Sequence, residues 1–334
     1  DADRSYSALY PVCFYFYAGC LSAYIFKDYL KMTGIILIML ISFLFPGVIL
    51  RTKSIASGRK GPGLLQPVYD IGVLLRKGSV FSNTTGLIFQ IAPAVALASI
   101  FCSALLIPFA DQNSVISFDG DFVFFAYLLA LGRFFMIIGA LDTGSSFEGM
   151  GANREALFSM LLEPAFFILM GTFAMLTGYT SFAEIFRHFY ISGNQYMLIY
   201  GILGFYLLLQ IALIENSRLP VDDPKTHLEL TMIHEVMILD HSGFDKALIH
   251  IATYIKFAIY GSLIFNGIVP AKWNIFLQIG LFLSIQAMFA IIIGLTESFR
   301  ARNKMNKNPK FILTLSFIAL LAFVVVLILT DKLI

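Results

Sequence analysis

The chain contains eight stretches in which apolar residues continue for about twenty positions, and this feature constrains its fold more than any other. The stretches cover residues 33–50, 87–109, 122–141, 157–178, 196–214, 247–269, 274–296 and 311–330. A helix needs roughly 20 apolar residues to cross the hydrocarbon core of a bilayer, where an open backbone finds no water to bond with. We therefore predict an all-α, polytopic transmembrane helix bundle with eight core spans.

The scarcity of charged residues fits a chain that is surrounded by lipid instead of water. Charged residues make up 13% of the 334 residues, hydrophobic residues make up 58%, and the mean hydropathy is +0.82. Soluble proteins carry about 25% charged residues. An ordinary soluble enzyme and a disordered chain are therefore excluded, and the net charge of +2 gives no sign of a nucleic-acid partner.

Residues 8–26 form a ninth apolar stretch that is rich in Tyr. Its length predicts an extra N-terminal transmembrane helix, with a hairpin at the membrane surface as the alternative, because Tyr favours membrane interfaces. We therefore separate an N-terminal extension, residues 1–30, from a membrane domain, residues 31–334. The sequence begins at Asp1 instead of Met and leaves the true N-terminus undefined.

The basic residues are distributed unequally between the two sides that eight alternating spans define. Loops 51–86, 142–156, 215–246 and 297–310 fall on one side and carry 15 Lys and Arg, whereas the other side carries five. The positive-inside rule predicts that the first side is cytoplasmic. Because it also contains the two longest loops, we expect the functional surface to face the cytoplasm.

A short surface helix is predicted within the first of these loops. Residues 58–63 form a basic, turn-forming stretch. Apolar residues then recur at helical spacing: Leu64, Leu65, Val68, Ile71, Gly72 and Leu75. This pattern predicts an amphipathic helix lying at the cytoplasmic membrane surface; a simple linker is the alternative.

Three charged residues interrupt the apolar stretches, where a charge costs about 2.5–3.5 kcal/mol on insertion scales. They are Arg133, Glu163 and Lys256. Counted along their helices, all three lie roughly 10–15 Å below the predicted cytoplasmic surface. Pro164 follows Glu163 and favours a helix kink there. We predict a buried polar layer with a functional role; structural bridges between helices are the alternative.

The predicted loop 215–246 contains seven carboxylates and three histidines. Pro220 and Pro224 frame part of it in a rigid turn. Carboxylates gathered against the membrane suit proton uptake and charge relay. No metal site is predicted, because neither an HxxxH nor an HExxH spacing is present and the three cysteines, Cys13, Cys20 and Cys102, lack a metal-ligand spacing.

Four blocks of sequence, taken together, resemble one known family. They are residues 58–66, 133–147, 149–164 and 215–243, in that order along the chain. The sequence resembles the complex I subunit 1 family. Within it, the Leu-Asp-Thr-Gly-Ser run at Asp142 and the run that starts at Asp222 resemble the membrane anchor subunit of group 4 membrane-bound NiFe hydrogenases, of the formate hydrogenlyase subunit 4 and hydrogenase-4 component C type.

The resemblance implies a membrane domain like that of complex I subunit 1, which anchors the peripheral redox module of a hydrogenase-type respiratory complex and couples its electron transfer to H⁺ or Na⁺ translocation. Its partners would be hydrogenase-like large and small subunits or a complex I-like peripheral arm, together with antiporter-like membrane subunits. Those subunits would contain the NiFe centre and the iron–sulfur clusters. This chain would bind no cofactor and contain no complete catalytic site, and it would lie in the cytoplasmic (inner) membrane of a prokaryote.

The resemblance and the residue pattern together give expected roles for particular residues. Proton or ion relay is expected of Glu163, Glu215, Asp222, Asp223, Glu229, Glu235, Asp240, Arg133 and Lys256. Docking of the peripheral module or lining of a cavity is expected of Arg59, Lys60, Gln66, Asp70, Asp142, Arg154, Glu155, Arg218 and His227. In the mechanism that we predict, redox chemistry in the docked module changes the protonation of the loop acids, and this change passes through Glu163, Arg133 and Lys256.

Three other functions remain as alternatives. The protein could be the quinone-site subunit of a complex I-like NADH:quinone oxidoreductase, with quinone bound in its cavity. It could be a secondary transporter, although no convincing half-to-half repeat is present. It could also be a structural anchor without chemistry, which the cost of burying Glu163 and Lys256 argues against.

Overall fold

The computed structural model describes residues 31–109, 112–189, 195–222, 232–269 and 273–330. Within these ranges the protein is helical and contains no β-strand, and eight helices are long and apolar enough to cross a membrane. The all-α membrane bundle with eight core spans is therefore confirmed. The predicted extra N-terminal helix falls on residues 1–30, which lie outside the described residues.

The eight spans occur close to their predicted positions. They are the first helix, Lys31–Ala56, then α3 (Leu87–Leu105), α4 (Asp121–Asp142), α5 (Ser146–Thr177), α7 (Gln195–Glu215), α9 (Gly243–Ile268), α10 (Ile275–Phe299) and α11 (Asn308–Leu329). Shorter helices are α2 (Gln66–Leu75), α6 (Phe182–Phe189) and α8 (His234–Met237), and a 3₁₀ turn, Met305–Lys307, precedes α11.

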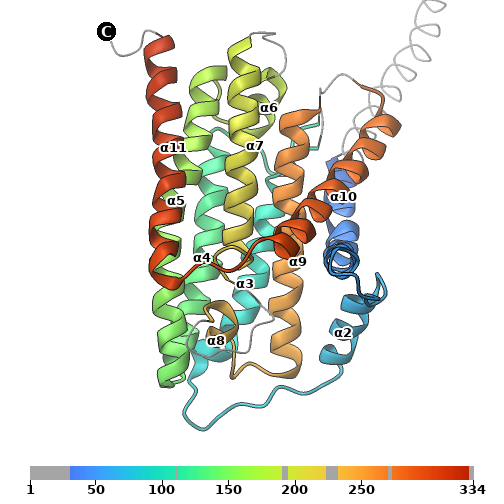
Figure 1. Cartoon of the computed structure of the whole chain (residues 1–334), viewed down its shortest axis with the longest axis vertical. Helices are drawn as coiled ribbons and strands as arrows, with labels where there is room; N and C mark the ends of the chain where they lie inside the picture. Colours follow the sequence, from blue (N-terminus) through green and yellow to red (C-terminus); the bar gives the residue numbers. More distant parts are fainter. Residues whose placement is uncertain (1–30, 110–111, 190–194, 223–231, 270–272, 331–334) are drawn as a thin grey trace, which may run out of the picture.

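The spans pack into one bundle around α4, α5, α7 and α9 (Figure 1). The helix α3 packs on α4 and α9, and α11 packs along α5 at one edge of the bundle. Close approach of α3 and α4 depends on Gly132, because a Cβ there would collide with the Ser99 hydroxyl and meet the backbone of Ala96. The core is rich in phenylalanine: the ring of Phe45, for example, packs against those of Phe257 and Phe289.

The helix α5 is longer than predicted. It begins at Ser146 rather than near residue 157, and its 32 residues reach about 48 Å at 1.5 Å per residue. Its polar first part resembles a loop in sequence, but there its charged side chains have partners inside the protein. Glu148 accepts a hydrogen bond from the Asp240 N–H, and Arg154 donates one to the Met232 carbonyl oxygen.

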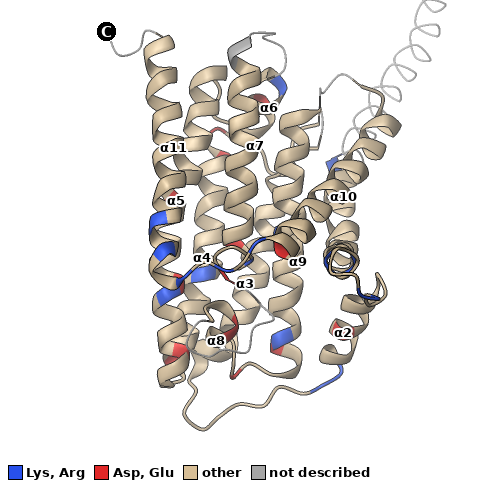
Figure 2. Cartoon of the chain, viewed as in Figure 1, with Lys and Arg blue, Asp and Glu red and all other residues tan. Residues whose placement is uncertain are grey.

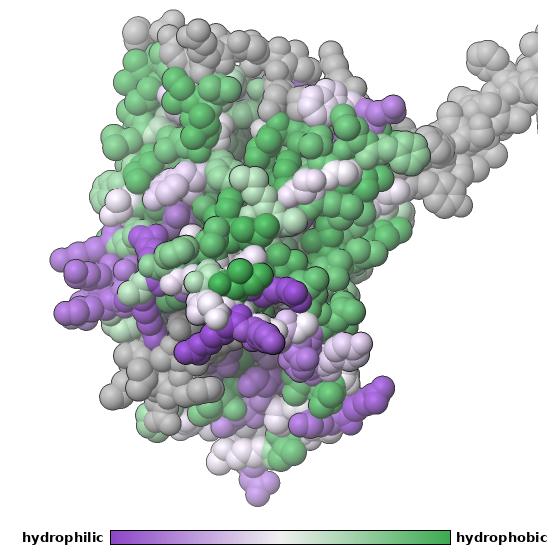
Figure 3. All heavy atoms as spheres, turned by 45° about the vertical axis from the view of Figure 1, so that its right-hand side comes forward, coloured by the Kyte–Doolittle hydropathy of each residue, from purple (hydrophilic) through white to green (hydrophobic). Residues whose placement is uncertain are grey.

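Of the loops predicted to share one side, the segments that precede α3 and flank α8 lie at the lower end of the bundle in Figure 1. Figure 2 shows most charged residues in this lower half, including some in the interior, whereas the upper parts of the helices carry few. The connector between α10 and α11 (residues 300–307) crosses the front of the bundle well above the lower ends of α5 and α9. In Figure 3, hydrophilic residues form a band below a mainly hydrophobic upper surface.

The predicted short helix after the basic turn is present as α2. It packs on α9 and buries Pro67 and Ile71. Leu64, Leu65 and Leu75, which belong to the same predicted apolar stripe, are exposed in the isolated chain. A short helix is therefore present at the predicted place, and its amphipathic character and its position at a membrane surface stay predictions.

Candidate functional site

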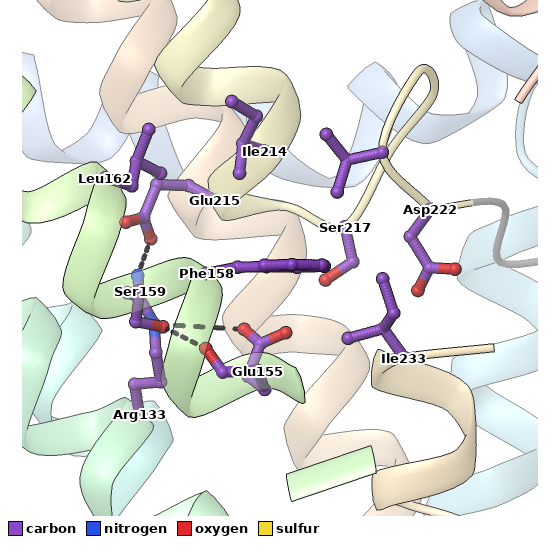
Figure 4. A pocket seen from close by; sticks show the side chains of 11 residues that line it. Arg133, Glu155, Phe158, Ser159, Leu162, Ile214, Glu215, Ser217, Asp222 and Ile233 are labelled. Atoms are coloured by element: carbon purple, nitrogen blue, oxygen red, sulfur yellow. Dashed lines mark hydrogen bonds and ion pairs between the residues drawn. The ribbon is translucent and has the colours of Figure 1, made fainter. Parts of the chain in front are cut away.

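A buried arginine in the middle of the bundle collects three carboxylates. Arg133 projects from α4, and its side chain is 8% exposed. It forms a hydrogen-bonded ion pair with Glu215, the last residue of α7. Its guanidinium also lies 3.9 Å from the Glu155 carboxylate and 3.8 Å from the Glu163 carboxylate, both on α5. Figure 4 shows Arg133 between Glu215 and Glu155.

A lysine from α9 completes the group. The Lys256 ammonium donates a hydrogen bond to the Glu215 carbonyl oxygen at 2.9 Å and lies 3.6 Å from its carboxylate. We call Arg133, Glu155, Glu163, Glu215 and Lys256 the charge cluster. The prediction that Arg133, Glu163 and Lys256 share a buried polar layer agrees with this geometry, and Glu215 connects the lysine to the rest.

Local helix geometry explains why these residues meet. Glu155 and Glu163 are eight residues apart on α5, which is close to two helical turns and places them on the same face. Because α4 and α5 are joined by a short turn at Thr143, this face lies beside Arg133. Glu215 reaches the same level because α7 ends there.

The charges of the cluster do not balance. Two cations face three carboxylates, so the formal charge is −1 when all five groups are ionised. An uncompensated charge is costly inside a membrane. Binding one proton makes the group neutral, which suits proton storage and transfer. Glu163 is the most accessible acid, because its side chain is 41% exposed whereas that of Glu215 is 6% exposed.

Three small cavities meet at the Arg133–Glu215 pair. The largest, about 50 Å³, is also lined by His234, Thr253 and Lys256. A second, about 20 Å³, is lined by Glu163 and Tyr260, and a third, about 10 Å³, by Ser217 and Asp222. A water molecule needs roughly 10–15 Å³ of such space and polar partners. These cavities therefore suit a few waters that bridge the charged groups.

A second set of buried ion pairs lies beside the charge cluster. Glu297, near the end of α10, has a side chain that is 2% exposed and that pairs with Lys53 at 3.3 Å and Arg218 at 3.0 Å. Asp222 accepts from Arg302 at 2.9 Å and from the His234 backbone N–H at 3.0 Å. We call Lys53, Arg218, Asp222, Glu297 and Arg302 the connector clamp.

The connector clamp fixes residues 216–222 against the connector between α10 and α11. The Asn303 N–H donates to the Pro220 carbonyl oxygen at 2.9 Å, and the Asn308 side-chain amide donates to the Val221 carbonyl oxygen at 3.0 Å. The Leu219–Pro220 peptide bond is cis. The segment that leaves the charge cluster is therefore held at both its backbone and its side chains.

Other residues that the sequence singled out lie away from the charge cluster. Asp142 accepts hydrogen bonds from the N–H groups of Gly86 and Phe89, so it caps the start of α3 and ties it to the end of α4. Gln66 and Asp70 bond to each other on the exposed side of α2. These contacts give Asp142 a structural role in addition to any part in docking.

The remaining predicted residues divide into two groups. Asp223, His227 and Glu229 lie outside the described residues. Arg59 and Lys60 lie in an exposed loop, Glu235 lies in α8, and Asp240 lies just after it, bonded to Glu148. None of these last four belongs to the charge cluster.

The sequence reasoning missed His234, Tyr260 and Glu297. Burial lowers the pKa of His234, although the nearby Glu235 opposes this effect. A neutral imidazole beside a polar cavity can accept and return a proton. Glu297 could have been found, because it is an acid at the edge of an apolar stretch. The sequence does not mark His234 and Tyr260 as site residues in this way, because only the fold shows which cavities they line.

His241 is buried apart from both charge groups. Its ring stacks on Phe89 with centroids 4.0 Å apart, and neither ring nitrogen has a hydrogen-bond partner in the described part of the protein. Burial, together with the positive charges of His234 and Lys246, lowers the pKa of His241 to about 4.

The described residues contain no group of His, Cys, Asp or Glu that could bind a metal ion.

Comparison with known proteins identifies related sequences along most of the chain. The family described as NADH dehydrogenase matches residues 30–328. Hydrogenase-4 component C of Escherichia coli (strain K12) is 29% identical over 213 residues, which is 64% of this chain and 66% of that protein. Formate hydrogenlyase subunit 4 of the same organism is 34% identical over 142 residues, covering 42% of this chain and 46% of that protein.

More distant relatives match over a similar length. A subunit of the NADH-quinone oxidoreductase of Bacillus thuringiensis (strain Al Hakam) is 24% identical over 240 residues, covering 69% of this chain and 70% of that protein. The fold is also similar to a chain of the membrane-bound sulfane sulfur reductase, an archaeal respiratory membrane complex. That match has a TM-score of 0.71 and 18% identity, and it covers 90% of this chain and 99% of the other.

Proposed function

The chain belongs to the NADH dehydrogenase family, and on that premise we propose that it anchors the peripheral redox module of a membrane-bound hydrogenase-type respiratory complex and couples its electron transfer to H⁺ or Na⁺ translocation. Its similarity to subunits of hydrogenase-4 and formate hydrogenlyase supports this proposal. The matches span about two thirds of the first relative and under half of the second. The NiFe centre and iron–sulfur clusters belong to hydrogenase-like partner subunits, and antiporter-like subunits lie beside this protein in the membrane.

The proposed orientation places the main loops in the cytoplasm of a prokaryote. The excess of Lys and Arg in loops 51–86, 142–156, 215–246 and 297–310 supports it. The segments that precede α3 and flank α8 lie at the lower end of the bundle in Figure 1, and the connector between α10 and α11 lies higher. The redox module then docks on the surface formed by α2, α8 and the first part of α5.

One observation carries the coupling role: the charge cluster has an excess carboxylate inside the bundle, next to cavities that suit water. A structural bridge between helices needs only balanced pairs. With one carboxylate in excess, the electrostatic energy of the charge cluster instead depends on whether one of its carboxylates is protonated. This property links a redox event, which changes charge at the docked module, to the protonation of groups within the membrane.

The arrangement of the cluster suggests a sequence of steps. A proton enters through the cavity that His234 lines and reaches Glu215. Protonation of Glu215 weakens its ion pair with Arg133, which then turns toward Glu163, now 3.8 Å away. The two pairings of Arg133 are the two-state element that such coupling requires. Glu163, the most exposed acid of the cluster, passes the change to the neighbouring membrane subunit.

The test compares two buried Glu→Gln variants in the assembled complex. Glu215→Gln, in the charge cluster, is expected to lose most of its ion translocation per turnover, because the carboxylate that would accept the proton is gone, while assembly and redox turnover persist. Glu297→Gln, in the connector clamp, is the matched control and should keep its translocation stoichiometry. Translocation per turnover is measured with a pH-sensitive dye and ²²Na⁺ in proteoliposomes. Normal translocation by Glu215→Gln would overturn the proposal.

The alternative is a quinone-site subunit, as the similarity to the NADH-quinone oxidoreductase subunit suggests. A quinone analogue that carries a photoreactive group separates the two functions. Labelling of the residues around α2 and α9, blocked by excess quinone, would favour the alternative. Co-purification of nickel with a hydrogenase-like subunit, without such labelling, favours the hydrogenase-type complex.

A further inference from the structure

The connector between α10 and α11 is strongly basic. Between residues 298 and 330 the sequence contains five Lys and Arg and no Asp or Glu. Arg302 pairs with Asp222 in the connector clamp, and Arg300 lies over the ring of Phe311. This leaves Lys304, Lys307 and Lys310, all exposed, with no carboxylate within ion-pair distance among the described residues.

The three lysines share one face because they are spaced by three residues. Lys304 comes just before a 3₁₀ turn that ends at Lys307, and the Lys307 N–H donates to the Lys304 carbonyl oxygen at 2.8 Å. This i→i+3 hydrogen bond keeps the two residues close together. Lys310 follows one helical turn later on α11, and i,i+3 positions are again neighbours there. The result is a row of three exposed lysines along the start of α11.

Three other residues of the connector and of the start of α11 make hydrogen bonds to the bundle. Arg302, Asn303 and Asn308 bond to Asp222, Pro220 and Val221 respectively. These bonds attach the connector to the bundle, whereas the side chains of the three lysines make no such bond to the described residues. Lys310 does not stabilise α11 either, since a cation in the first turn of a helix opposes its dipole.

The position of the connector places this row at the edge of the hydrocarbon core. The helices that it joins are 25 and 22 residues long, close to the length of a single crossing. Both therefore reach the membrane surface where the connector begins and ends, whereas α5 continues below that level (Figure 1).

Exposed apolar side chains continue from the row of lysines along the two helices. Phe299, at the end of α10, is 82% exposed, and Phe317 on α11 is 61% exposed. In Figure 3, the hydrophilic band meets the hydrophobic surface at this level. A ligand that fits the region therefore needs an anionic group for the lysines and an apolar part for the helices.

We propose that Lys304, Lys307 and Lys310 bind the headgroup of an anionic phospholipid, whose acyl chains lie along α10 and α11. Charge complementarity selects the anionic headgroup, because each basic residue near a membrane surface adds to the attraction for such lipids. The adjoining apolar side chains favour a lipid over an acidic soluble protein, which would leave Phe299 and Phe317 in water. Lipid bound here sits on the outer face of the connector whose inner face contacts residues 216–222.

The test titrates the purified full-length protein in detergent with phosphatidylglycerol or phosphatidylcholine and measures bound lipid by native mass spectrometry. Phosphatidylglycerol should bind more tightly. The triple variant Lys304→Gln, Lys307→Gln and Lys310→Gln should bind it on the order of a hundredfold more weakly, at about 1 kcal/mol for each lysine. Because the three side chains are exposed, the variant should unfold at the wild-type temperature in phosphatidylcholine.

The matched control neutralises three exposed cations of another loop: Arg59→Gln, Lys60→Gln and Lys77→Gln. This variant should retain tight binding of phosphatidylglycerol. Equal losses in both triple variants would show a general effect of net charge and would overturn the proposal. Glycerol phosphate that binds as tightly as the phospholipid would also overturn it, since the acyl chains would then contribute nothing. A third outcome would also overturn the proposal: the three lysine substitutions abolish binding of an acidic partner subunit but leave phosphatidylglycerol binding unchanged.

Discussion

The charge cluster and the connector clamp are neighbouring sets of buried ion pairs, and they differ in balance. The cluster contains two cations for three carboxylates, and two of its Arg133 contacts are 3.8–3.9 Å long. The clamp contains three cations for two carboxylates, and its pairs are 2.9–3.3 Å long. The Glu155 and Glu215 side chains of the cluster are 13% and 6% exposed, and the Arg218 and Arg302 side chains of the clamp are similarly buried, at 12% and 15%. Burial is therefore similar in the two sets, and the property by which they differ is the ratio of acids to bases.

The largest expected effect comes from removing the cation that the cluster shares. Arg133→Leu leaves three carboxylates, of which Glu155 and Glu215 are buried, with Lys256 alone, and breaking a buried pair in this way costs about 3–5 kcal/mol of unfolding free energy. Unfolding in mixed SDS micelles measures it. The double variant Arg133→Leu with Glu215→Leu removes one cation and one acid together, and should recover part of the loss. A single variant as stable as the wild type would show that Arg133 does not hold the cluster together.

The next largest expected effect is the pH dependence of stability due to His241, which belongs to neither the charge cluster nor the connector clamp. Because the folded-state pKa of His241 is about 4 and the unfolded value is about 6.5, the unfolded chain takes up the proton first as pH falls. The stability that neutral His241 contributes is therefore fully present above pH 6.5 and is lost as pH falls toward 4, by up to about 3 kcal/mol. His241→Phe should flatten the unfolding free energy measured across this range. An unchanged slope would assign the acid sensitivity to the carboxylates of the cluster or clamp.

The smallest expected effect compares the loss of one carboxylate from the charge cluster with the loss of one from the connector clamp. Glu163→Gln leaves two carboxylates for two cations, so we expect its unfolding free energy to stay within about 1 kcal/mol of the wild type. Glu297→Gln removes charged hydrogen bonds to Lys53 and Arg218 and should cost about 2 kcal/mol. Both are measured in the same SDS titration. A larger loss for Glu163→Gln than for Glu297→Gln would contradict the argument from charge balance.

The sequence was sufficient for the spans because the bilayer sets their length, and because an isolated charge such as Arg133 stands out in an apolar stretch. It was insufficient for the start of α5. Glu148 and Arg154 looked like loop residues, and only the fold brings Asp240 and Met232 within reach of them. For the same reason Asp142 could be singled out but not recognised as a cap of α3, since Gly86 and Phe89 lie over fifty residues earlier in the chain.

The pairing of acids with bases was also beyond prediction. Asp222 and Glu215 belong to one acidic run in the sequence, yet Asp222 pairs with Arg302 and Glu215 with Arg133. Spacing along the sequence cannot assign partners that are eighty residues away. Helical periodicity placed Glu155 and Glu163 on one face only once α5 was known to include both.

The uninterrupted length of α5 makes it a mechanical element. Glu148, near the surface where the redox module is proposed to dock, and Glu163, within the cluster, are joined by about 22 Å of continuous helix. A stiff rod conveys a displacement from one end to the other without loss in an intervening loop. Pro164 follows Glu163 and weakens the rod there by removing a backbone hydrogen bond, while the Ser316 hydroxyl of α11 donates to the Leu161 carbonyl oxygen beside it. The point at which α5 can bend, Pro164, is therefore adjacent to Glu163, the charged residue that a movement of α5 would displace.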